Sequence, residues 1–173
     1  MTQLTYNEAF DPYHTVFRFL RLREGCNIKK ALHFDVLRIL DFYLLFPFRI
    51  QGMSLHSEDI GWRGISRSYA NLTPYGEIPD DLSIFSKMEP FQRAAVTSLC
   101  NVGALSEEAW SKDEVLFEEI ELNENLILRC KELNHSMADI LDILSAIIEH
   151  YPLLGRNGLK DRTGLLEFRY DAI

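Results

Sequence analysis

The segment 36–46 is apolar on almost every side of a helix, and it most constrains how this chain can fold. Asp35 stands where a helix cap is expected, and Pro47 disfavours helix at Phe46. Its apolar residues are Ile39, Leu40, Phe42, Tyr43, Leu44 and Leu45. A helix that has almost no polar side must be surrounded by the rest of the protein. We therefore expect a central helix over 36–46.

Two charged residues interrupt this apolar segment. Arg38 and Asp41 are three positions apart, so they lie on neighbouring positions of a helix and are expected to pair with each other. The apolar run 36–50 is shorter than the ~20 residues that a membrane-spanning helix needs. Because the apolar run is short and is interrupted by Arg38 and Asp41, we expect no membrane contact.

Further helices are expected on both sides of this segment. Asp11 and Pro12 are typical of a helix start, and Gly25 of its end. The remaining expected helices are a short one around 57–69, one from Pro90 to Val102, one after the cap Asn123, and one from a capping-box-like start at Ser136 to Tyr151. Ala94, Ala95 and Leu99 should belong to the buried stripe of the second of these, together with Phe91 and Val102. Gly103 is expected in the left-handed conformation that ends it.

The β content predicted from the sequence is small. Residues 113–122 mix acidic and apolar residues and predict a short strand or wing, which would follow the 90–102 helix as in a winged helix. The fold class is therefore mainly α with a small β component, a winged-helix-like element and a C-terminal strand. We expect one domain, 1–173; a subdivision near 51–88 would separate the helical pair of 1–50 from 88–173.

The end of the chain is a candidate binding segment. Leu166, Phe168 and Tyr170 alternate with charged residues, which is the period of a half-buried strand, and a basic, glycine-rich stretch precedes them. A strand needs a neighbour, either in this chain or in another. The candidate partner-binding residues are Arg162, Leu166, Phe168, Arg169 and Tyr170.

The charge and cysteine content exclude some classes of protein. A formal net charge of −8 opposes a broad phosphate-binding surface. The three cysteines are far apart and odd in number, which indicates reduced, buried thiols. The first residues carry neither a basic nor an apolar stretch, so a cytoplasmic protein is expected.

No catalytic or metal-binding motif is found. The histidines never form a His-x-x-x-His pair, and the sequence contains neither Cys-x-x-Cys nor a phosphate-binding Gly-rich loop followed by Lys. His14 beside Asp11 is interpreted as an ordinary helix residue, and Asp80 with Asp81 as a helix cap. We expect no enzyme activity, no metal and no cofactor.

Several segments in collinear order resemble the middle components of bacterial ABC-three-component systems, which include the small subunit of Lamassu-type defence against phages and plasmids. They are 11–14 with Phe17-Arg18, 37–47, 74–81, 92–95 with Leu99, and 164–171. The resemblance implies a non-catalytic adaptor between an SMC-like ABC ATPase and an effector, often a nuclease. Nucleic acid would then be reached only through the ATPase.

An alternative reading from the residues is a winged-helix regulator that binds DNA. Its 91–102 helix would enter the major groove, with Arg93 as the basic residue of that helix. The acidic net charge weighs against this alternative.

Overall fold

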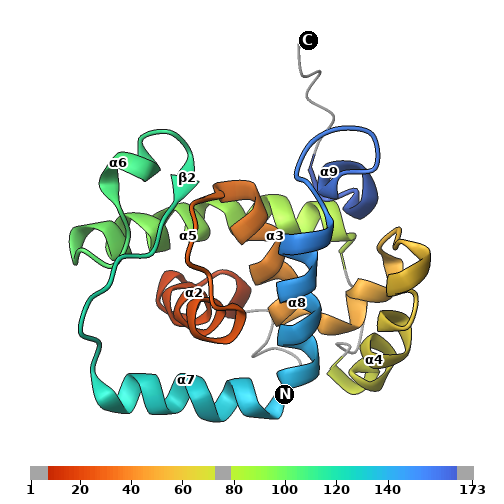
Figure 1. Ribbon diagram of the computed structural model, residues 1–173, viewed down its shortest axis with the longest axis horizontal. Coiled ribbons are helices and arrows are strands. Elements are labelled where there is room, and N and C mark those ends of the chain that lie inside the picture. The colour runs from red at the N-terminus through yellow and green to blue at the C-terminus, as the bar shows by residue number, and fades with distance from the viewer. Residues whose placement is uncertain (1–7, 73–78, 167–173) are drawn as a thin grey trace.

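The computed structural model describes residues 8–72 and 79–166, and it is mainly helical with a small sheet (Figure 1). The α-helices are α2 (Pro12–Cys26), α3 (Phe34–Leu45), α4 (Trp62–Ser68), α5 (Asp81–Asn101), α6 (Glu107–Trp110), α7 (Glu124–Ser136), α8 (Ala138–His150) and α9 (Leu159–Thr163). The strands are β1 (Leu32–His33) and β2 (Glu114–Val115), and short 3₁₀ turns lie at Pro47–Gly52, Ser57–Asp59 and Ala70–Leu72. The expected fold class, mainly α with a small β component, is confirmed, and the expected C-terminal strand lies outside the described residues.

Helix α3 is the central element, as its sequence predicts. It contacts α2, α5 and α8 (Figure 1), and its apolar residues are buried along its length. Its cap differs from the prediction, because the helix begins at Phe34 and the His33 Nδ1 accepts the amide of Asp35 at 3.1 Å. Asp35 therefore lies in the first turn, where its carboxylate is available to a side chain of the next turn.

Helix α5 is longer than the sequence predicts. The carboxylate of Asp80 accepts the amide of Ser83 at 2.9 Å and caps the helix, so Pro90 lies inside it instead of opening it. The buried stripe accordingly begins at Ile84, whereas Ala94 and Val102, which were expected to be buried, are exposed. Residues 81–88, at the end of the segment 51–88 where a subdivision was expected, are thus part of this helix.

The predicted end of this helix is confirmed. Gly103 has a φ of +74°, its amide bonds the carbonyl of Cys100, and the Ala104 amide reaches the carbonyl of Leu99 at 2.8 Å. These two bonds form a Schellman ending, which satisfies carbonyls that have no partner within the helix. Leu105, two residues later, is buried.

The sheet joins distant parts of the chain. Strand β1 pairs antiparallel with β2, with Leu32 opposite Val115 and His33 opposite Glu114. An isolated bridge joins Leu105 to Phe117, and α6 lies between these two residues in the chain. The strand expected within 113–122 is present, but its ladder is formed with β1 near the other end of the chain.

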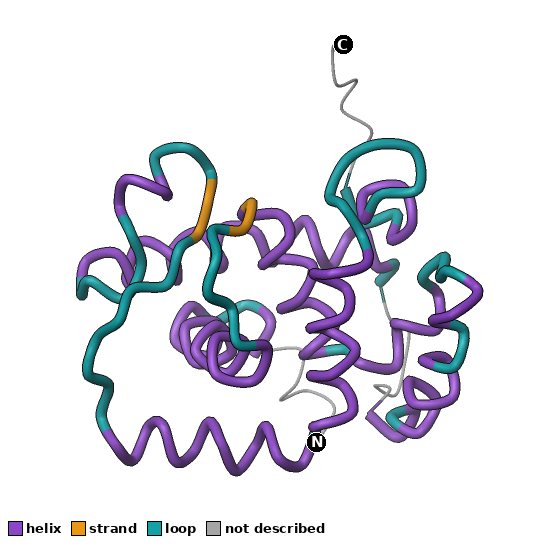
Figure 2. The backbone as a smooth tube through the Cα atoms, viewed as in Figure 1, coloured by secondary structure: helices purple, strands orange, loops and turns teal. Residues whose placement is uncertain are grey.

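The C-terminal half confirms one predicted cap and corrects another. The side chain of Asn123 accepts the amides of Asn125 and Leu126 and caps α7. Ser136 is the last residue of α7 and caps nothing, because its hydroxyl donates to the carbonyl of Leu133. Helix α8 begins two residues later and buries the apolar face that its sequence predicts. Figure 2 shows the loop that follows α8 curling back to the short α9.

Candidate functional site

A buried polar network joins α2, α3 and α5. The guanidinium of Arg18 donates to both carboxylate oxygens of Asp41, at 2.6 and 3.1 Å, and the Gln92 amide donates to Asp41 at 2.9 Å. Asp41 and Gln92 have no exposed surface. The expected pair between Arg38 and Asp41 is therefore wrong, because Asp41 faces α2 and α5 while Arg38 has other partners.

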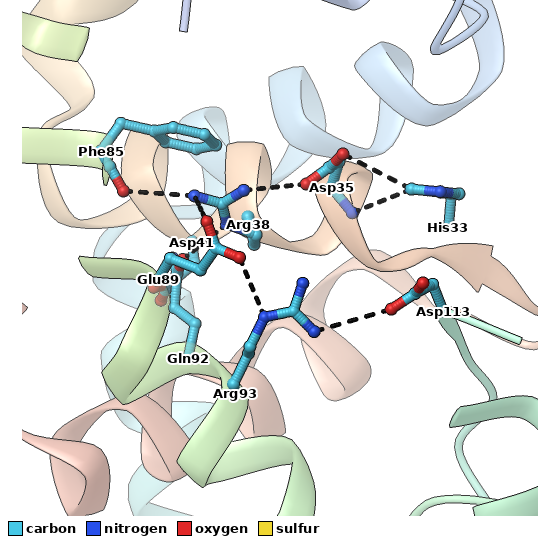
Figure 3. Close-up of polar contacts among 9 residues, drawn as sticks. All are labelled: His33, Asp35, Arg38, Asp41, Phe85, Glu89, Gln92, Arg93 and Asp113. Carbon is cyan, nitrogen blue, oxygen red and sulfur yellow. Dashed lines mark hydrogen bonds and ion pairs between the residues drawn. The ribbon is translucent and has the colours of Figure 1, made fainter. Parts of the chain in front are cut away.

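Arg38 continues this network toward the surface (Figure 3). Its guanidinium donates to the Gln92 side-chain oxygen at 3.0 Å, to Asp35 at 2.8 Å and to the carbonyl of Phe85 at 3.3 Å. It also lies 3.3 Å from the carboxylate of Glu89 and stacks 4.2 Å above the centre of the Phe85 ring. Every one of these partners belongs to α3 or α5, so this cation fixes the two helices relative to each other.

Exposed ion pairs extend the network along α5 to the loop before β2. Arg93 donates to Glu89 at 2.9 Å and lies 3.6 Å from Asp113 (Figure 3). Burial alone would lower the pKa of the Arg93 guanidinium, but Glu89 and Asp113 outweigh it, and the pKa is raised. Arg93 also lies over the ring of Phe34, 4.9 Å from its centre.

A pocket of about 480 Å³ lies above this row of charges. Its charged wall comes from the start of α3, the middle of α5 and Asp113. Its apolar wall comes largely from the C-terminal segment, through Leu153, Leu154, Leu165 and Leu166. Leu154 is 52% exposed. The pocket thus combines a row of alternating charges with accessible leucines, an arrangement that suits a peptide with one polar and one apolar face.

The segment that ends at the pocket is held in place by Arg162. Its guanidinium donates to the carbonyl of Ser54 at 2.8 Å and to that of Asn157 at 2.5 Å, and it lies 5.2 Å from the centre of the Tyr151 ring. The Ser54 amide in turn donates to the Arg162 carbonyl at 2.9 Å. This predicted site residue therefore braces the C-terminal segment from within the chain.

The other predicted site residues divide into two groups. Leu166 lines the pocket, whereas Phe168, Arg169 and Tyr170 lie outside the described residues. Sequence reasoning missed Leu153 and Leu154, although two leucines directly after the Pro152 that ends α8 are an apolar pair in a turn. It also missed the pocket side of α5, because the helix was expected to begin at Pro90.

A second polar cluster anchors the loop 53–59 to the end of α8. The carboxylate of Asp59 accepts the Tyr151 hydroxyl at 2.6 Å and lies 3.2 Å from the Nδ1 of His150, and the His56 amide donates to the Tyr151 oxygen at 2.9 Å. Burial, together with the bond to Asp59, raises the pKa of Tyr151 to about 12. The cluster adjoins Arg162, whose guanidinium lies over the ring of the same Tyr151.

This cluster also contains donor atoms of the kinds that bind metals. One atom each from His56, Glu58 and Asp59 lies within 4.8 Å of the others. The oxygens of Asp59 already bond to His150 and Tyr151, and Glu58 is exposed at the surface. We interpret this group as a hydrogen-bonded structural junction, which explains each of its contacts.

The two acidic positions that invited a catalytic interpretation are helix caps. A carboxylate oxygen of Asp11 accepts the amides of Tyr13 and His14, and the bond from the His14 amide lowers the Asp11 pKa. Asp80 caps α5 in the same way. His14 is exposed on the first turn of α2. The structural interpretation of these residues is confirmed.

The acidic charge of the chain is concentrated in one segment. Residues 107–124 hold eight acidic residues and one lysine, a formal charge of −7 out of −8 for the whole chain. All eight carboxylates are on exposed residues. They are Glu107, Glu108, Asp113, Glu114, Glu118, Glu119, Glu121 and Glu124. The segment runs from α6 through β2 to the start of α7, and Asp113, directly before β2, lines the pocket.

Two searches against known proteins returned nothing, and a third identified a family. No curated protein and no solved structure gave a significant match. Across the described ranges, no helix combines the length and apolar character needed to cross a membrane. The family model described as ABC-three component (ABC-3C) system Middle Component 5 matches residues 4–171 of the 173-residue chain. The chain therefore belongs to the family of ABC-three-component system middle components, type 5.

Proposed function

We propose that this chain is a non-catalytic adaptor in a bacterial defence complex of the Lamassu type. It would join an SMC-like ABC ATPase to a toxic effector, often a nuclease, in the cytoplasm. The observation that carries the proposal is the family match, because a middle component is by its description one part of a system of several components. The pocket and the acidic segment are two chemically different surfaces, as a protein with two partners requires.

The docking surface that we propose is the pocket and the tail that begins beside it. Leu166 lines the pocket, and Phe168, Arg169 and Tyr170 follow it in the chain. Arg162 would contribute by bracing this segment, since its guanidinium is used on Ser54, Asn157 and Tyr151. In this scheme Arg162 acts on a partner through the position of the segment, and the residues after Leu166 contact it.

We propose that the chain itself carries out no chemistry. The candidate carboxylates of Asp11 and Asp80 cap helices, and the carboxylate of Asp59 is hydrogen-bonded to His150 and Tyr151. The cysteines described as free thiols are poor nucleophiles at neutral pH, because burial raises the pKa of Cys26 to about 11 and also raises that of Cys100 and Cys130. These features favour a binding role.

The sheet topology gives the alternative, a winged-helix DNA reader, one supporting observation. β2 is joined to β1 on one side, and Phe117, just after it, is bridged to Leu105 on the other, an order that winged helices share. The charge distribution opposes DNA binding, since Arg93 is paired with Glu89 and Asp113 and the acidic segment begins close to the end of α5. We expect no shift of labelled duplex DNA by the isolated protein at low salt; a shift that weakens in Arg93→Ala would favour the DNA reader.

Copurification tests the adaptor proposal directly. The chain would carry an affinity tag and be expressed together with the products of its neighbouring genes. We expect an ABC ATPase and a second subunit to elute with it in fixed ratio through gel filtration. Pairwise expression then asks whether the two partners associate when this chain is left out. If they assemble equally well without it, or if neither elutes with it, the chain is not the adaptor.

A further inference from the structure

We infer that the pocket between α3, α5 and the segment 153–166 binds a cationic and apolar segment of a partner protein, in which arginine or lysine side chains stand beside large apolar ones. This assignment rests on the adaptor role proposed above and adds the chemistry of the partner. The cations of the partner would meet the wall formed by α3, α5 and Asp113, and its apolar side chains would meet the leucines of the opposite wall.

The cations that line the pocket are already engaged within the chain. The side chain of Arg38 is only 5% exposed, and each of its three nitrogens contacts an acceptor of α3 or α5. Arg93 lies between the carboxylates of Glu89 and Asp113. Lys160, which is half-buried, also has an interaction partner. An anionic ligand would therefore have to compete with carboxylates that are held in place beside these cations.

The carboxylates of the pocket, in contrast, keep acceptor capacity for a ligand. Asp35 accepts the Arg38 guanidinium on Oδ1 at 2.8 Å, and its Oδ2 lies 3.8 Å from the Nδ1 of His33, beyond hydrogen-bond distance. Asp113 pairs with Arg93 through Oδ1 at 3.6 Å, and its side chain is 64% exposed. Because each carboxylate oxygen can accept two hydrogen bonds, both groups can bind an incoming guanidinium or ammonium group.

The position of Asp113 is fixed by its backbone. Its φ is +57°, a conformation that Asp and Asn adopt more readily than most other residues with side chains. Its carbonyl accepts the amide of Phe34 at 2.8 Å, and its own amide donates to the carbonyl of Trp110 at 3.1 Å. These bonds hold Asp113 against the start of α3, where Asp35 also lies. A carboxylate that is already in place loses little freedom when a cation binds.

The surroundings favour a partner that is both cationic and apolar. Asp113 belongs to the segment 107–124, whose formal charge of −7 attracts cations at long range. Leu153, Leu154 and Leu166 line the opposite wall, and Leu154 is 52% exposed, so an apolar contact there removes surface from water. A wholly apolar partner would cover the carboxylates without a counter-charge, which is costly, and a wholly charged one would leave the leucines exposed.

Titration of the isolated, full-length protein with two synthetic peptides tests this assignment. Both peptides carry the same leucines at alternate positions; one has arginines between them, and the other has glutamates. Amide chemical shifts, followed by NMR, report on Ser86, Asp113 and Leu154 in the pocket and on Leu128 of α7, which lies outside it. At low salt we expect the arginine peptide to shift the three pocket signals, and to bind at least about tenfold more tightly than the glutamate peptide.

Two variants with matched controls assign the binding to the two walls. Asp113→Asn keeps a residue suited to the positive φ and removes one charge, so the arginine peptide should bind about two- to fivefold more weakly. Its control is Glu119→Gln, which removes the same charge from an exposed residue of 107–124 that does not line this pocket. Leu154→Ser should weaken binding by about threefold or more, whereas Leu128→Ser, at a residue of similar exposure, should not change it.

Equal or tighter binding of the glutamate peptide would overturn the assignment, as would the absence of shifts with either peptide at millimolar concentration. Arginine-peptide shifts that spare Leu154 and weaken equally in Asp113→Asn and Glu119→Gln would also overturn it, because the acidic segment alone would then be the site. Copurification tests the adaptor role separately. Peptide binding at the pocket without a copurifying ATPase would refute the adaptor role alone, and the reverse result would refute this assignment alone.

Discussion

At the level of single residues, Asp41 has the most demanding environment in the described chain. Its carboxylate has no exposed surface and accepts bonds from Arg18 and Gln92, which come from two other helices. A buried charge is tolerated only when it is paired and hydrogen-bonded. Because α3 is a central helix, Asp41 is surrounded by the core, and its cationic partner, Arg18, is buried there as well.

Asp41→Ala should destabilise the protein by about 3–5 kcal/mol, because it leaves the Arg18 guanidinium buried without its anion. The free energy of unfolding from urea titration measures this loss. The double variant Arg18→Met with Asp41→Leu removes both charges and should be closer to wild type than Asp41→Ala. The single variants Arg18→Met and Asp41→Leu complete the comparison. If the double variant loses as much free energy of unfolding as these two lose in sum, the pair is not coupled.

The raised pKa of Tyr151 should make the stability of the folded protein depend on pH in the alkaline range. Its pKa is raised to about 12 in the folded protein, mainly by burial, from an ordinary value of 10. A raised folded pKa contributes stability that is complete below pH 10 and is lost between pH 10 and pH 12. Tyr151→Phe should therefore be less stable than wild type at pH 8, by about 1–3 kcal/mol for the hydrogen bond lost at Asp59, and this difference should shrink as pH rises to 12.

Chemical denaturation at a series of pH values checks this expectation. Tyr13→Phe is the control, because Tyr13 is 84% exposed and should not change the pH dependence. Burial also raises the pKa of Tyr43, and those of Cys26 and Tyr69 to about 11 and about 12, so wild type and both variants lose stability in this range. A gap between wild type and Tyr151→Phe that stays constant up to pH 12 would contradict the assignment.

The residue types that form polar pairs could be predicted from the sequence, but their partners could not. Arg38 and Asp41 are visible as charges in an apolar helix, and spacing within that helix made them the obvious pair. In the structure they point to different neighbours, since Asp41 meets Arg18 of α2 and Arg38 meets Phe85 and Gln92 of α5. Contacts between helices depend on how the helices pack, which local spacing does not encode.

At the level of helices, Gly25 shows that a glycine near a helix end can serve packing. Helix α2 continues one residue beyond it to Cys26, and Asn27 takes the left-handed conformation, with a φ of +49°. A Cβ at Gly25 would lie 2.8 Å from both terminal methyls of Leu141 and 3.0 Å from the Asn134 amide. The glycine thus allows α2 to approach α7 and α8 closely.

Gly25→Ala should lower the free energy of unfolding by about 1–3 kcal/mol, because buried Leu141 and the bonded Asn134 must move. Gly64→Ala is the matched change in another helix. It lies within α4 with no atom within 4 Å of a Cβ, so it should stabilise the protein by about 0.5–1 kcal/mol. Thermal unfolding of the two variants should shift in opposite directions. A stabilised Gly25→Ala would show that the α2–α8 approach is looser than described.

Helix identity was predictable where long apolar periods exist, and helix ends were predictable only where one residue type decides them. Gly103 and Asn123 gave correct ends, because a left-handed residue and a side-chain cap act locally. Pro90 and Ser136 gave wrong helix starts, because proline and serine are common at helix starts but do not require one. Helix α5 begins upstream of Pro90, where it packs on α3, and α7 continues to Ser136.

At the level of the whole molecule, the charge distribution separates two regions of the surface. Outside 107–124 the chain is almost neutral, with a formal charge of −1, and the acidic segment holds the rest. The candidate pocket balances its own charges through Arg38, Glu89 and Arg93. The net charge alone predicted weak binding to nucleic acid. The pocket could not be predicted from the sequence, because its lining residues are far apart in the chain and only the fold brings them together.

If the adaptor proposal holds, the acidic segment should speed association with whichever partner presents a basic surface. Long-range attraction raises association rates and is screened by salt. The variant Glu119→Gln with Glu121→Gln changes two exposed residues of this segment. The control, Asp142→Asn with Glu149→Gln, removes the same charge from exposed positions of α8.

With a partner subunit obtained by copurification, we expect the first variant to associate several-fold more slowly than wild type at low ionic strength, and the control to differ little. The difference should vanish near 0.5 M salt, where the screening length is only a few ångströms. Biolayer interferometry measures both rate constants, and dissociation should change little, because exposed rim charges act mainly on encounter. Equal slowing by both variants would mean that only total charge matters, and that this segment does not face the partner.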